Sequence, residues 1–245
     1  MKLNSLLILI FLIPFHAKSD QIYELIKIPN LKLYKTDDKG IRFLIADKNF
    51  SAGVGVNSVN CERFEKNKIK SKFLLTKKNI DFYSKNFLKK INLKYIILCK
   101  NLIVSDIPAI GFANPEMKTI ILNINSNEKI FQRVIHHEIF HIIHKNFENH
   151  FNNDKWSKFN NAEFKYSQCS TCKKDIGLEI LNVTNGFFTK YAKTTVSEDM
   201  AETFSFLVIN NEYVQKKIDD DLVIKNKTIF IKENVLKIYE NFKFR

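Results

Sequence analysis

After its first 19 residues the sequence lacks any apolar run that approaches the roughly 18–20 residues needed to cross a bilayer. It also lacks an internal repeat and a low-complexity linker. We therefore expect no membrane span in the chain that follows residue 19. A chain of this length without linkers is typical of one large domain or two closely packed lobes.

Arginine is scarce, although the chain is basic. The formal net charge is +13, from 39 Lys and Arg against 26 Asp and Glu. Such a charge can indicate a polyanionic partner, but the lysines are scattered among Asn and Ile, and neither an Arg-rich arm nor a nucleic-acid-binding module is present. We expect no nucleic acid partner. Binding to a polyanion, such as nucleic acid or an anionic envelope component, is the weaker alternative.

The first residues are typical of a secretory signal peptide. An apolar run from Leu3 to Phe15 is followed by "HAKSD", in which Ala17 and Ser19 supply small residues before a cut at Asp20. This pattern predicts a signal peptide over residues 1–19 and an exported protein, periplasmic or extracellular. No cysteine follows the run, so a lipid anchor is not indicated. An uncleaved N-terminal anchor is the alternative interpretation.

The four cysteines all follow the predicted signal peptide, and an even number in an oxidising compartment favours disulfides. Three pairings are possible and the sequence does not separate them. The simplest joins Cys61 to Cys99 and Cys169 to Cys172. The "CSTC" motif could also be redox-active or half of a zinc knuckle. Because a second pair is absent and no strand clearly precedes the motif, we favour a local structural disulfide.

Hydrophobic spacing and turn residues predict an α+β chain, with strands mainly in its first half and helices in its second. A strand-rich lobe over residues 20–125 and a helical lobe over 126–245 should form one compact unit. Asn127 or Ser126 can cap one helix and Ser197 another. The predicted elements are strands or loops over 22–60, a helix over 76–92, a buried strand over 93–104, two strands around a turn over 107–125, a helix over about 128–146, a loop over 148–175, a helix that starts after Ser197 and runs to about Asn210, and an amphipathic helix over the last 20 residues.

Four of the six histidines lie in one short stretch, "HHEIFHIIH" (136–144). It contains an H-E-x-x-H sequence, and on a helix His137 and His141 lie about 40° apart and one turn along. Two imidazoles can therefore hold one Zn²⁺, while Glu138 reaches the zinc-activated water as general base. The alternative is a helix whose histidines are solvated or satisfied in the core.

A third ligand would strengthen the zinc interpretation. An H-E-x-x-H-x-x-G-x-x-H pattern fails, because His144 and Phe147 stand at its last two fixed positions. A thermolysin-like pattern needs a Glu on a second helix and an acidic residue four positions later, and Glu198 and Glu202 fit it. An acidic first turn favoured by the helix dipole would explain Glu198 and Asp199 but not Glu202. Asp199 is the main rival for the third ligand.

"HEIFH" followed by "YAKTTVSEDMAETF" resembles the gluzincin metallopeptidases, especially bacterial secreted zinc-binding metallopeptidases with H-E-x-x-H and E-D-x-A-E. It is also similar to the catalytic domains of lethal factor and the Pro-Pro endopeptidases. "WSKFNNAEFKY" (156–166) resembles the W…N…F.Y segment of the bacterial group. The resemblance covers roughly residues 107–210. Two features depart from it: the separation of His141 from Glu198 implies an inserted loop, and His136 and His144 are extra histidines.

The resemblance implies a zincin-like metallopeptidase fold. This is a small mixed sheet with an edge strand over an active-site helix, followed by a mostly helical C-terminal lobe. It also implies a peptide or protein substrate. From its position alone, the "ANPEMKTIILNI" strand is a candidate edge strand that pairs with an extended substrate. The residue roles that it implies are one Zn²⁺ per chain held by His137, His141 and Glu198, Glu138 as general base, Glu202 as the acceptor of a hydrogen bond from a ligand imidazole, and Tyr191, seven residues before Glu198, as donor to the oxyanion.

Several alternatives stay open. A degenerate family member could bind zinc or a partner without catalysis. His144 would lie at the edge of the site or be incidental, and His136 would be structural or exposed. The sequence does not reveal the cleavage specificity or the oligomeric state.

Overall fold

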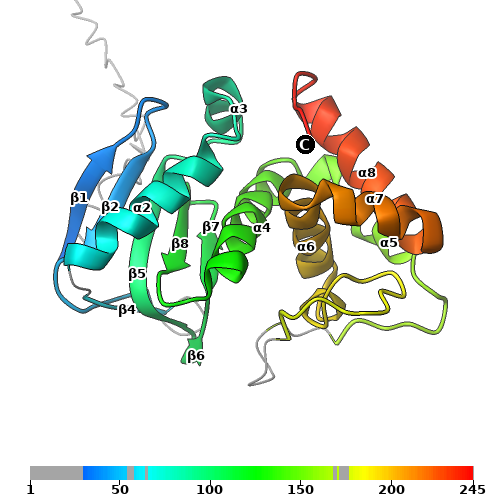
Figure 1. Cartoon of the computed structure of the whole chain (residues 1–245), viewed down its shortest axis with the longest axis horizontal. Helices are drawn as coiled ribbons and strands as arrows, with labels where there is room; N and C mark the ends of the chain where they lie inside the picture. Colours follow the sequence, from blue (N-terminus) through cyan, green and yellow to red (C-terminus); the bar gives the residue numbers. More distant parts are fainter. Residues whose placement is uncertain (1–29, 54–57, 64–65, 168–169, 171–176, 245) are drawn as a thin grey trace, which may run out of the picture.

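The protein is described by a computed structural model that covers residues 30–53, 58–63, 66–167, 170 and 177–244. The predicted signal peptide and the predicted Cys169–Cys172 pair lie outside these residues. Within them the chain is α+β, as predicted, with a curled sheet whose strands end at residue 123 and most of the helices after it (Figure 1). Two helices, over residues 66–80 and 85–90, stand between strands of the sheet. No helix in the described part of the chain is long and apolar enough to cross a membrane.

The sheet curls around one long strand, β5. The first half of β5 lies between β2 and β8, parallel to both, and its second half pairs antiparallel with β4 and β6. β1 pairs antiparallel with β2, and β7 pairs antiparallel with β8. The strands are β1 Leu31–Thr36, β2 Arg42–Ala46, β3 Phe50–Ala52, β4 Val59–Glu62, β5 Tyr95–Val104, β6 Ile107–Pro108, β7 Gly111–Asn114 and β8 Thr119–Asn123.

β5 is buried on both faces, which explains its nearly continuous apolar sequence. Ile96 and Leu98 belong to the core cluster that the helices share, whereas Ile97 and Cys99 belong to a second apolar cluster on the opposite face. Alternate side chains of a strand point to opposite faces, so both sets must be apolar. The buried strand predicted over 93–104 is confirmed.

The helices continue the core away from the sheet. α2 covers one face of the sheet, and α4 lies between the sheet and α6 (Figure 1). One apolar core runs from α2 and the sheet through α4 to α6 and α8. The division into two lobes at residues 125 and 126 stays a prediction. The helices are α2 Lys66–Ile80, α3 Lys85–Lys90, α4 Glu128–Asn146, α5 Asn153–Ser157, α6 Val196–Ile209, α7 Asn211–Asp220 and α8 Leu222–Ile238, with short 3₁₀ helices η2 Glu148–His150 and η3 Tyr191–Lys193.

The helix predicted over 76–92 is wrong in its bounds. α2 begins ten positions earlier and ends at Ile80, and α3 forms a separate helix. The side-chain oxygen of Ser84 accepts a hydrogen bond from the backbone N–H of Phe87 at 3.1 Å. Because an N-cap residue leaves the helical conformation, Ser84 separates the two helices although the apolar spacing continues across it.

Three other boundaries differ from the prediction. The loop over 148–175 contains η2 and α5, and Asn152 caps α5 by accepting from the N–H of Lys155 at 2.7 Å. The last helix begins at Leu222 after its cap Asp221 and ends at Ile238, so only part of the predicted range is helical. α7, which was not predicted, precedes it. η2 and α5 are short and polar, so the apolar spacing of residues 148–175 does not indicate them.

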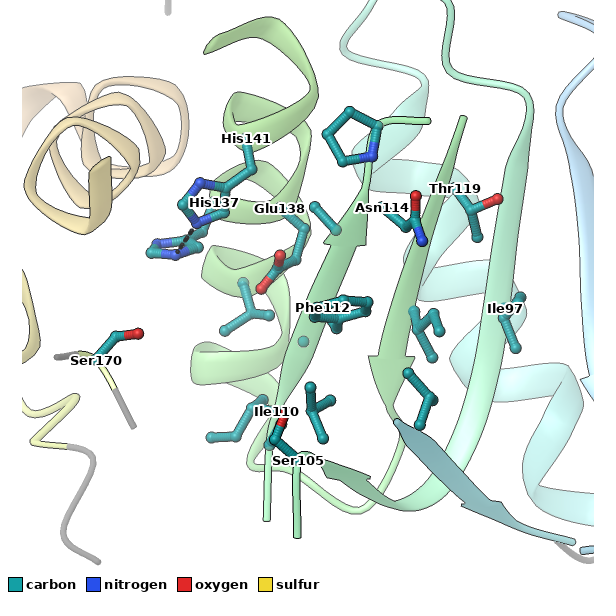
Figure 2. Close-up of a pocket in the computed structure, with 18 of the residues that line it drawn as sticks. Ile97, Ser105, Ile110, Phe112, Asn114, Thr119, His137, Glu138, His141 and Ser170 are labelled. Carbon is teal, nitrogen blue, oxygen red and sulfur yellow. Dashed lines mark hydrogen bonds between the residues drawn. The ribbon is translucent and has the colours of Figure 1, made fainter. Parts of the chain in front are cut away.

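β7 forms one edge of the sheet and lies directly beside α4 (Figure 2). Among the described residues it pairs with β8 alone. Gly111 permits this close approach, since a Cβ atom there would collide with Glu138 Oε1 and come 2.5 Å from Val134 Cγ1. The two strands predicted around a turn over 107–125 are confirmed, but only β7 lies at the edge. The "TIILN" part of the "ANPEMKTIILNI" stretch forms β8, which is interior because it pairs with both β5 and β7.

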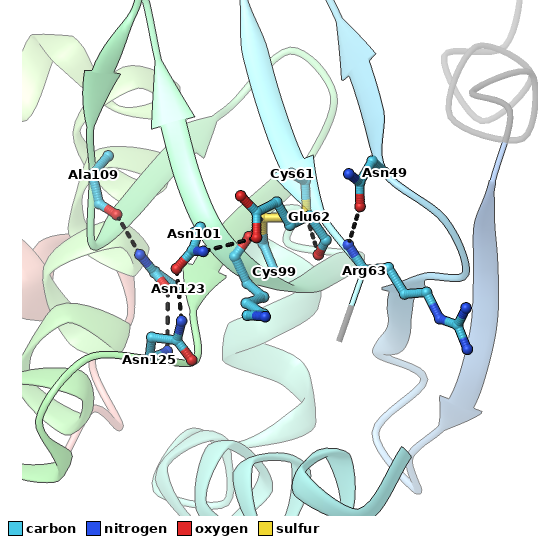
Figure 3. Close-up of a disulfide and its surroundings, with 10 residues drawn as sticks. Asn49, Cys61, Glu62, Arg63, Cys99, Asn101, Ala109, Asn123 and Asn125 are labelled. Carbon is cyan, nitrogen blue, oxygen red and sulfur yellow. Dashed lines mark hydrogen bonds between the residues drawn. A yellow bond between two sulfur atoms is a disulfide. The ribbon is translucent and has the colours of Figure 1, made fainter. Parts of the chain in front are cut away.

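A disulfide joins Cys61 of β4 to Cys99 of β5, with the Cα atoms 5.5 Å apart (Figure 3). This pairing is the one predicted as simplest. The bond closes a loop that contains α2 and α3, with a sequence separation of 38 residues. Closing such a loop removes conformational freedom from the unfolded chain and so stabilises the two strands against each other.

Candidate metal centre

α4 carries the H-E-x-x-H sequence, and its predicted bounds are confirmed. Asn127 is its N-cap, and its side chain accepts from the N–H of Lys129 at 2.9 Å. Because α4 lies between the sheet and α6, it is buried on most sides, including His137 and Glu138. The histidine side chains therefore project from a helix that packing holds on both flanks.

α6 supplies the carboxylates. Thr195 caps it, and its side chain accepts from the N–H of Glu198 at 3.2 Å. The helix therefore begins two residues earlier than the prediction with Ser197 as cap, because Thr195 has the extended backbone of a cap residue and Ser197 is already helical. Glu198 and Glu202 are one turn apart and both face α4.

Three side-chain atoms converge from the two helices. His137 Nε2 lies 2.9 Å from Glu198 Oε2, His141 Nε2 lies 3.2 Å from the same oxygen, and the two Nε2 atoms are 3.0 Å apart. We call these three atoms the triangle. The residues that carry them, His137, His141 and Glu198, form a group that could hold a metal ion. A tetrahedral zinc ion with ligands at about 2.0–2.1 Å has neighbouring ligand atoms about 3.3 Å apart. The observed triangle agrees with this spacing to within a few tenths of an ångström, so the donor set fits zinc.

Glu202 contacts His137 from the side opposite the triangle. His137 Nδ1 lies 3.0 Å from Glu202 Oε1, and Glu202 Oε2 accepts from the Thr189 hydroxyl at 2.8 Å. Burial alone would raise the pKa of Glu202, but the charge of Arg133 and the hydrogen bond to His137 outweigh it and lower that pKa. An ionised Glu202 can accept the proton on Nδ1, so that Nε2 can offer its lone pair to the triangle once Nε2 has lost its own proton.

Without a metal ion, the His137 ring of the triangle is protonated near neutral pH. Burial acts against charge on His137, but its hydrogen bonds to Glu198 and Glu202 outweigh burial and raise its pKa to about 10. Burial also acts against the Glu198 carboxylate, and the charge of His141 together with the hydrogen bonds from both rings lowers the pKa of Glu198 far below its usual value. Near neutral pH an imidazolium therefore faces a carboxylate in the metal-free protein.

Glu138 and Tyr191 flank the triangle in a cleft of about 1050 Å³ that β7 also lines. Figure 2 shows Glu138 on α4 beside His137 and His141. Burial raises the pKa of Glu138 in spite of the two histidine charges. The Tyr191 ring lies 5.8 Å from the His137 ring, measured between centroids. Burial, and then the charges of Glu198 and Glu138, raise the pKa of Tyr191 well above its usual value, so its hydroxyl keeps its proton.

Asp199, the rival third ligand, points away from the triangle. Its Oδ2 atom accepts from Trp156 Nε1 at 2.9 Å, from the Tyr166 hydroxyl at 2.7 Å and from Lys227 Nζ at 2.6 Å. Trp156 and Tyr166 belong to the segment that carries part of the family resemblance. Lys227 is fully buried and also donates to the Gly186 carbonyl at 2.7 Å. Asp199 is therefore a structural acceptor that ties α6 to α8.

The two extra histidines have different surroundings. His136 is buried, with Nδ1 2.7 Å from the Tyr83 hydroxyl and Nε2 3.1 Å from Asn79 Oδ1, which agrees with a structural role. His144 lies at the edge of the cleft, and burial lowers its pKa to about 4. Its Nδ1 lies 3.3 Å from the Ser197 hydroxyl. Ser197, predicted only as a cap, therefore faces the site.

The sequence interpretation missed Arg133, Thr189 and Lys227. Thr189 and Arg133 support Glu202, and Lys227 supports Asp199. An arginine in the middle of an otherwise apolar helix segment is the one local signal that could have indicated a buried acidic partner. Thr189 and Lys227 gave no such signal, because threonine and lysine are common residues at exposed positions.

Replacing Lys227 with Met should destabilise the metal-free protein by about 3–5 kcal/mol, because it leaves Asp199 buried without its cation. Urea unfolding followed by circular dichroism measures this. Lys225→Met, at an exposed position of α8, is the matched control and should change the free energy of unfolding by about 0.5 kcal/mol or less. A loss below about 1 kcal/mol for Lys227→Met would contradict the structural role of the pair.

Comparison with known proteins agrees with this geometry. A family model described as "Putative zinc-binding metallo-peptidase" matches residues 67–242. No curated protein matches the chain. The matched range contains α4, α6 and all three residues of the triangle. The chain therefore belongs to this family of zinc-binding metallopeptidases, which confirms the resemblance read from its motifs.

Proposed function

We propose that the protein is an exported zinc-dependent peptidase that hydrolyses bonds in peptide or protein substrates, with one zinc ion per chain. The observation that carries the proposal is the triangle of two imidazole nitrogens and one carboxylate oxygen with the Glu138 carboxylate beside it in a cleft. In this proposal the curled sheet, the edge strand β7 and α4 form a zincin-like fold. The Cys61–Cys99 disulfide is compatible with an oxidising compartment.

His137, His141 and Glu198 would hold the ion through Nε2, Nε2 and a carboxylate oxygen. Bound there, zinc would supply a Lewis acid that polarises the substrate carbonyl and lowers the pKa of water. Glu202 would keep the Nδ1 proton of His137 in place, so that the ring presents Nε2. Its full burial supports this role, because a carboxylate without solvent needs donors within the protein, and His137 and Thr189 lie within hydrogen-bond distance of its two oxygens.

Glu138 would act as the general base. It takes a proton from the attacking water and passes it to the leaving amine. Its 6% exposure and its raised pKa support the role, since a desolvated carboxylate is a stronger base than a solvated one. Gly111 contributes indirectly, because only a residue without a side chain leaves room for Glu138 beside β7.

Tyr191 would donate a hydrogen bond to the oxygen on which negative charge develops. Three features support this role: its place in the cleft, its short distance from His137 and its retained proton. A donor of this kind contributes most where water is excluded. Tyr191 lies on the short 3₁₀ helix η3, which comes directly before α6 in the chain.

The substrate would bind in an extended conformation along β7. Among the described residues, this strand is paired on one side only, so its other edge can accept a further strand. β7 lines the cleft together with the histidines, and the Phe112 side chain lies within it (Figure 2). Main-chain pairing of this kind would place a substrate carbonyl between Glu138 and the triangle.

Glu138→Gln should reduce peptide hydrolysis by about 10²–10⁴-fold, because the amide cannot accept the proton. Zinc content and thermal midpoint should stay close to those of the wild type. The measurement is cleavage of a broad peptide library, followed by mass spectrometry, with zinc determined in the same samples. Glu128→Gln, at the exposed start of α4, is the control and should retain full activity.

Two results would overturn parts of this proposal. Unchanged hydrolysis by Glu138→Gln would remove Glu138 from the mechanism. A folded, zinc-loaded wild type that cleaves nothing in the library would instead identify the protein as a zinc-binding family member without catalysis.

Zinc binding should release about one proton per ion near pH 7.5. The pKa of His137 is raised to about 10 in the metal-free protein, so the ring holds a proton that zinc must displace. Zinc affinity should therefore fall as the pH is lowered, by about tenfold per unit while His137 alone titrates. Calorimetric titrations in buffers with different ionisation enthalpies give the number directly. Release of no proton would contradict the charge state assigned to the triangle.

A further inference from the structure

The Ser197 hydroxyl lies between two histidine rings of α4. Its Oγ atom is 3.2 Å from His141 Nδ1 and 3.3 Å from His144 Nδ1. Ser197 belongs to the first turn of α6, and the two histidines are three residues apart on α4. Neither Ser197 nor His144 belongs to the H-E-x-x-H or E-D-x-A-E motifs of the chain.

The hydroxyl carries one proton, so it can donate to one ring nitrogen and must accept from the other. His141 Nε2 faces the triangle, 3.2 Å from Glu198 Oε2. For that nitrogen to offer its lone pair to a metal ion, the ring proton must be on Nδ1, where it donates to Ser197. The Ser197 hydroxyl then donates to His144 Nδ1, and the proton of His144 must be on Nε2.

The acceptor His144 and the central Ser197 of this hydrogen-bonded chain are both held in place. The His144 ring packs against Phe151 and Phe140, with centroids 5.7 Å and 5.9 Å away. The cap bond to Thr195 fixes the first turn of α6, which carries Ser197. The acceptor nitrogen and the serine backbone therefore have little freedom to reorient, which a group that orients a metal ligand requires.

We propose that Ser197 and His144 are positioning residues of the metal centre, which together hold His141 in the tautomer that presents Nε2. This inference rests on the proposed zinc site. The two ligand histidines would then be oriented by different chemistry, His137 by the carboxylate of Glu202 and His141 by a neutral hydroxyl. A neutral relay orients His141 without adding another negative charge beside Glu198 and Glu138.

Zinc affinity tests the proposal, measured by competition with a chromogenic chelator. Ser197→Ala should bind zinc about 10–100-fold more weakly than the wild type, and Ser197→Thr, which keeps the hydroxyl, should bind nearly as well. His144→Phe should lose affinity because it keeps the aromatic packing but removes the acceptor. His144→Asn should retain affinity, since its side-chain oxygen can replace Nδ1 as acceptor.

Ser205→Ala is the matched control. Ser205 is a buried serine on the same helix, and its hydroxyl donates to the Glu202 carbonyl at 2.8 Å, away from the histidines. Its replacement should leave zinc affinity unchanged. The thermal midpoint of each metal-free variant separates a lost hydrogen bond at the site from a general loss of stability.

A spectrum of the wild type tests the same assignment without any variant. In the zinc-loaded protein, long-range ¹H–¹⁵N correlations should show His141 protonated at Nδ1 and His144 protonated at Nε2. Protonation of His144 at Nδ1, or equal zinc affinity of Ser197→Ala and the wild type, would overturn the inference alone. A wild type that binds no zinc would overturn the proposed function together with it.

Discussion

Where α4 packs against α6, the His137 ring lies between the two glutamates of α6, with Nδ1 3.0 Å from Glu202 and Nε2 2.9 Å from Glu198. These contacts fix the register of one helix along the other. A shift by one residue in either helix would turn its side chains by about 100° and separate the groups. His141, one turn further along α4, meets Glu198 only because that register is fixed.

The first turn of α6 connects this register to the core. Neighbouring residues of a helix differ by about 100° in direction. Glu198 therefore faces the two histidines of the triangle, while Asp199 faces Lys227 and Trp156. The buried Asp199–Lys227 pair thus holds the turn that presents Glu198. The position of Glu198 and the stability of the fold therefore depend on the same turn of α6.

Local patterns predicted much of the site. The cap Asn127 and the helical apolar spacing were enough to place α4, and the spacing of Glu198 and Glu202 is visible in any helical projection of the sequence. The triangle follows once two helices are known to meet. Cys61 and Cys99 were the simplest of three possible pairings, and the structure joins them because their strands are neighbours.

The parts that the sequence did not predict depend on contacts between distant segments. Ser197 and His144 are 53 residues apart, and their contact follows from the packing of α4 on α6 rather than from either local sequence. Lys227 resembles any lysine of an amphipathic helix until α8 is placed beside Asp199. Ser84 was missed for another reason: a cap residue interrupts a helix without interrupting the apolar pattern.

A crystal structure of the zinc-loaded protein, with anomalous diffraction data at the zinc absorption edge, tests the central claim most directly. The account predicts one anomalous peak about 2.0–2.2 Å from His137 Nε2, His141 Nε2 and a Glu198 oxygen, with its remaining side open to the cleft. A peak elsewhere, or a Glu198 side chain turned away from both histidines in the loaded protein, would contradict it.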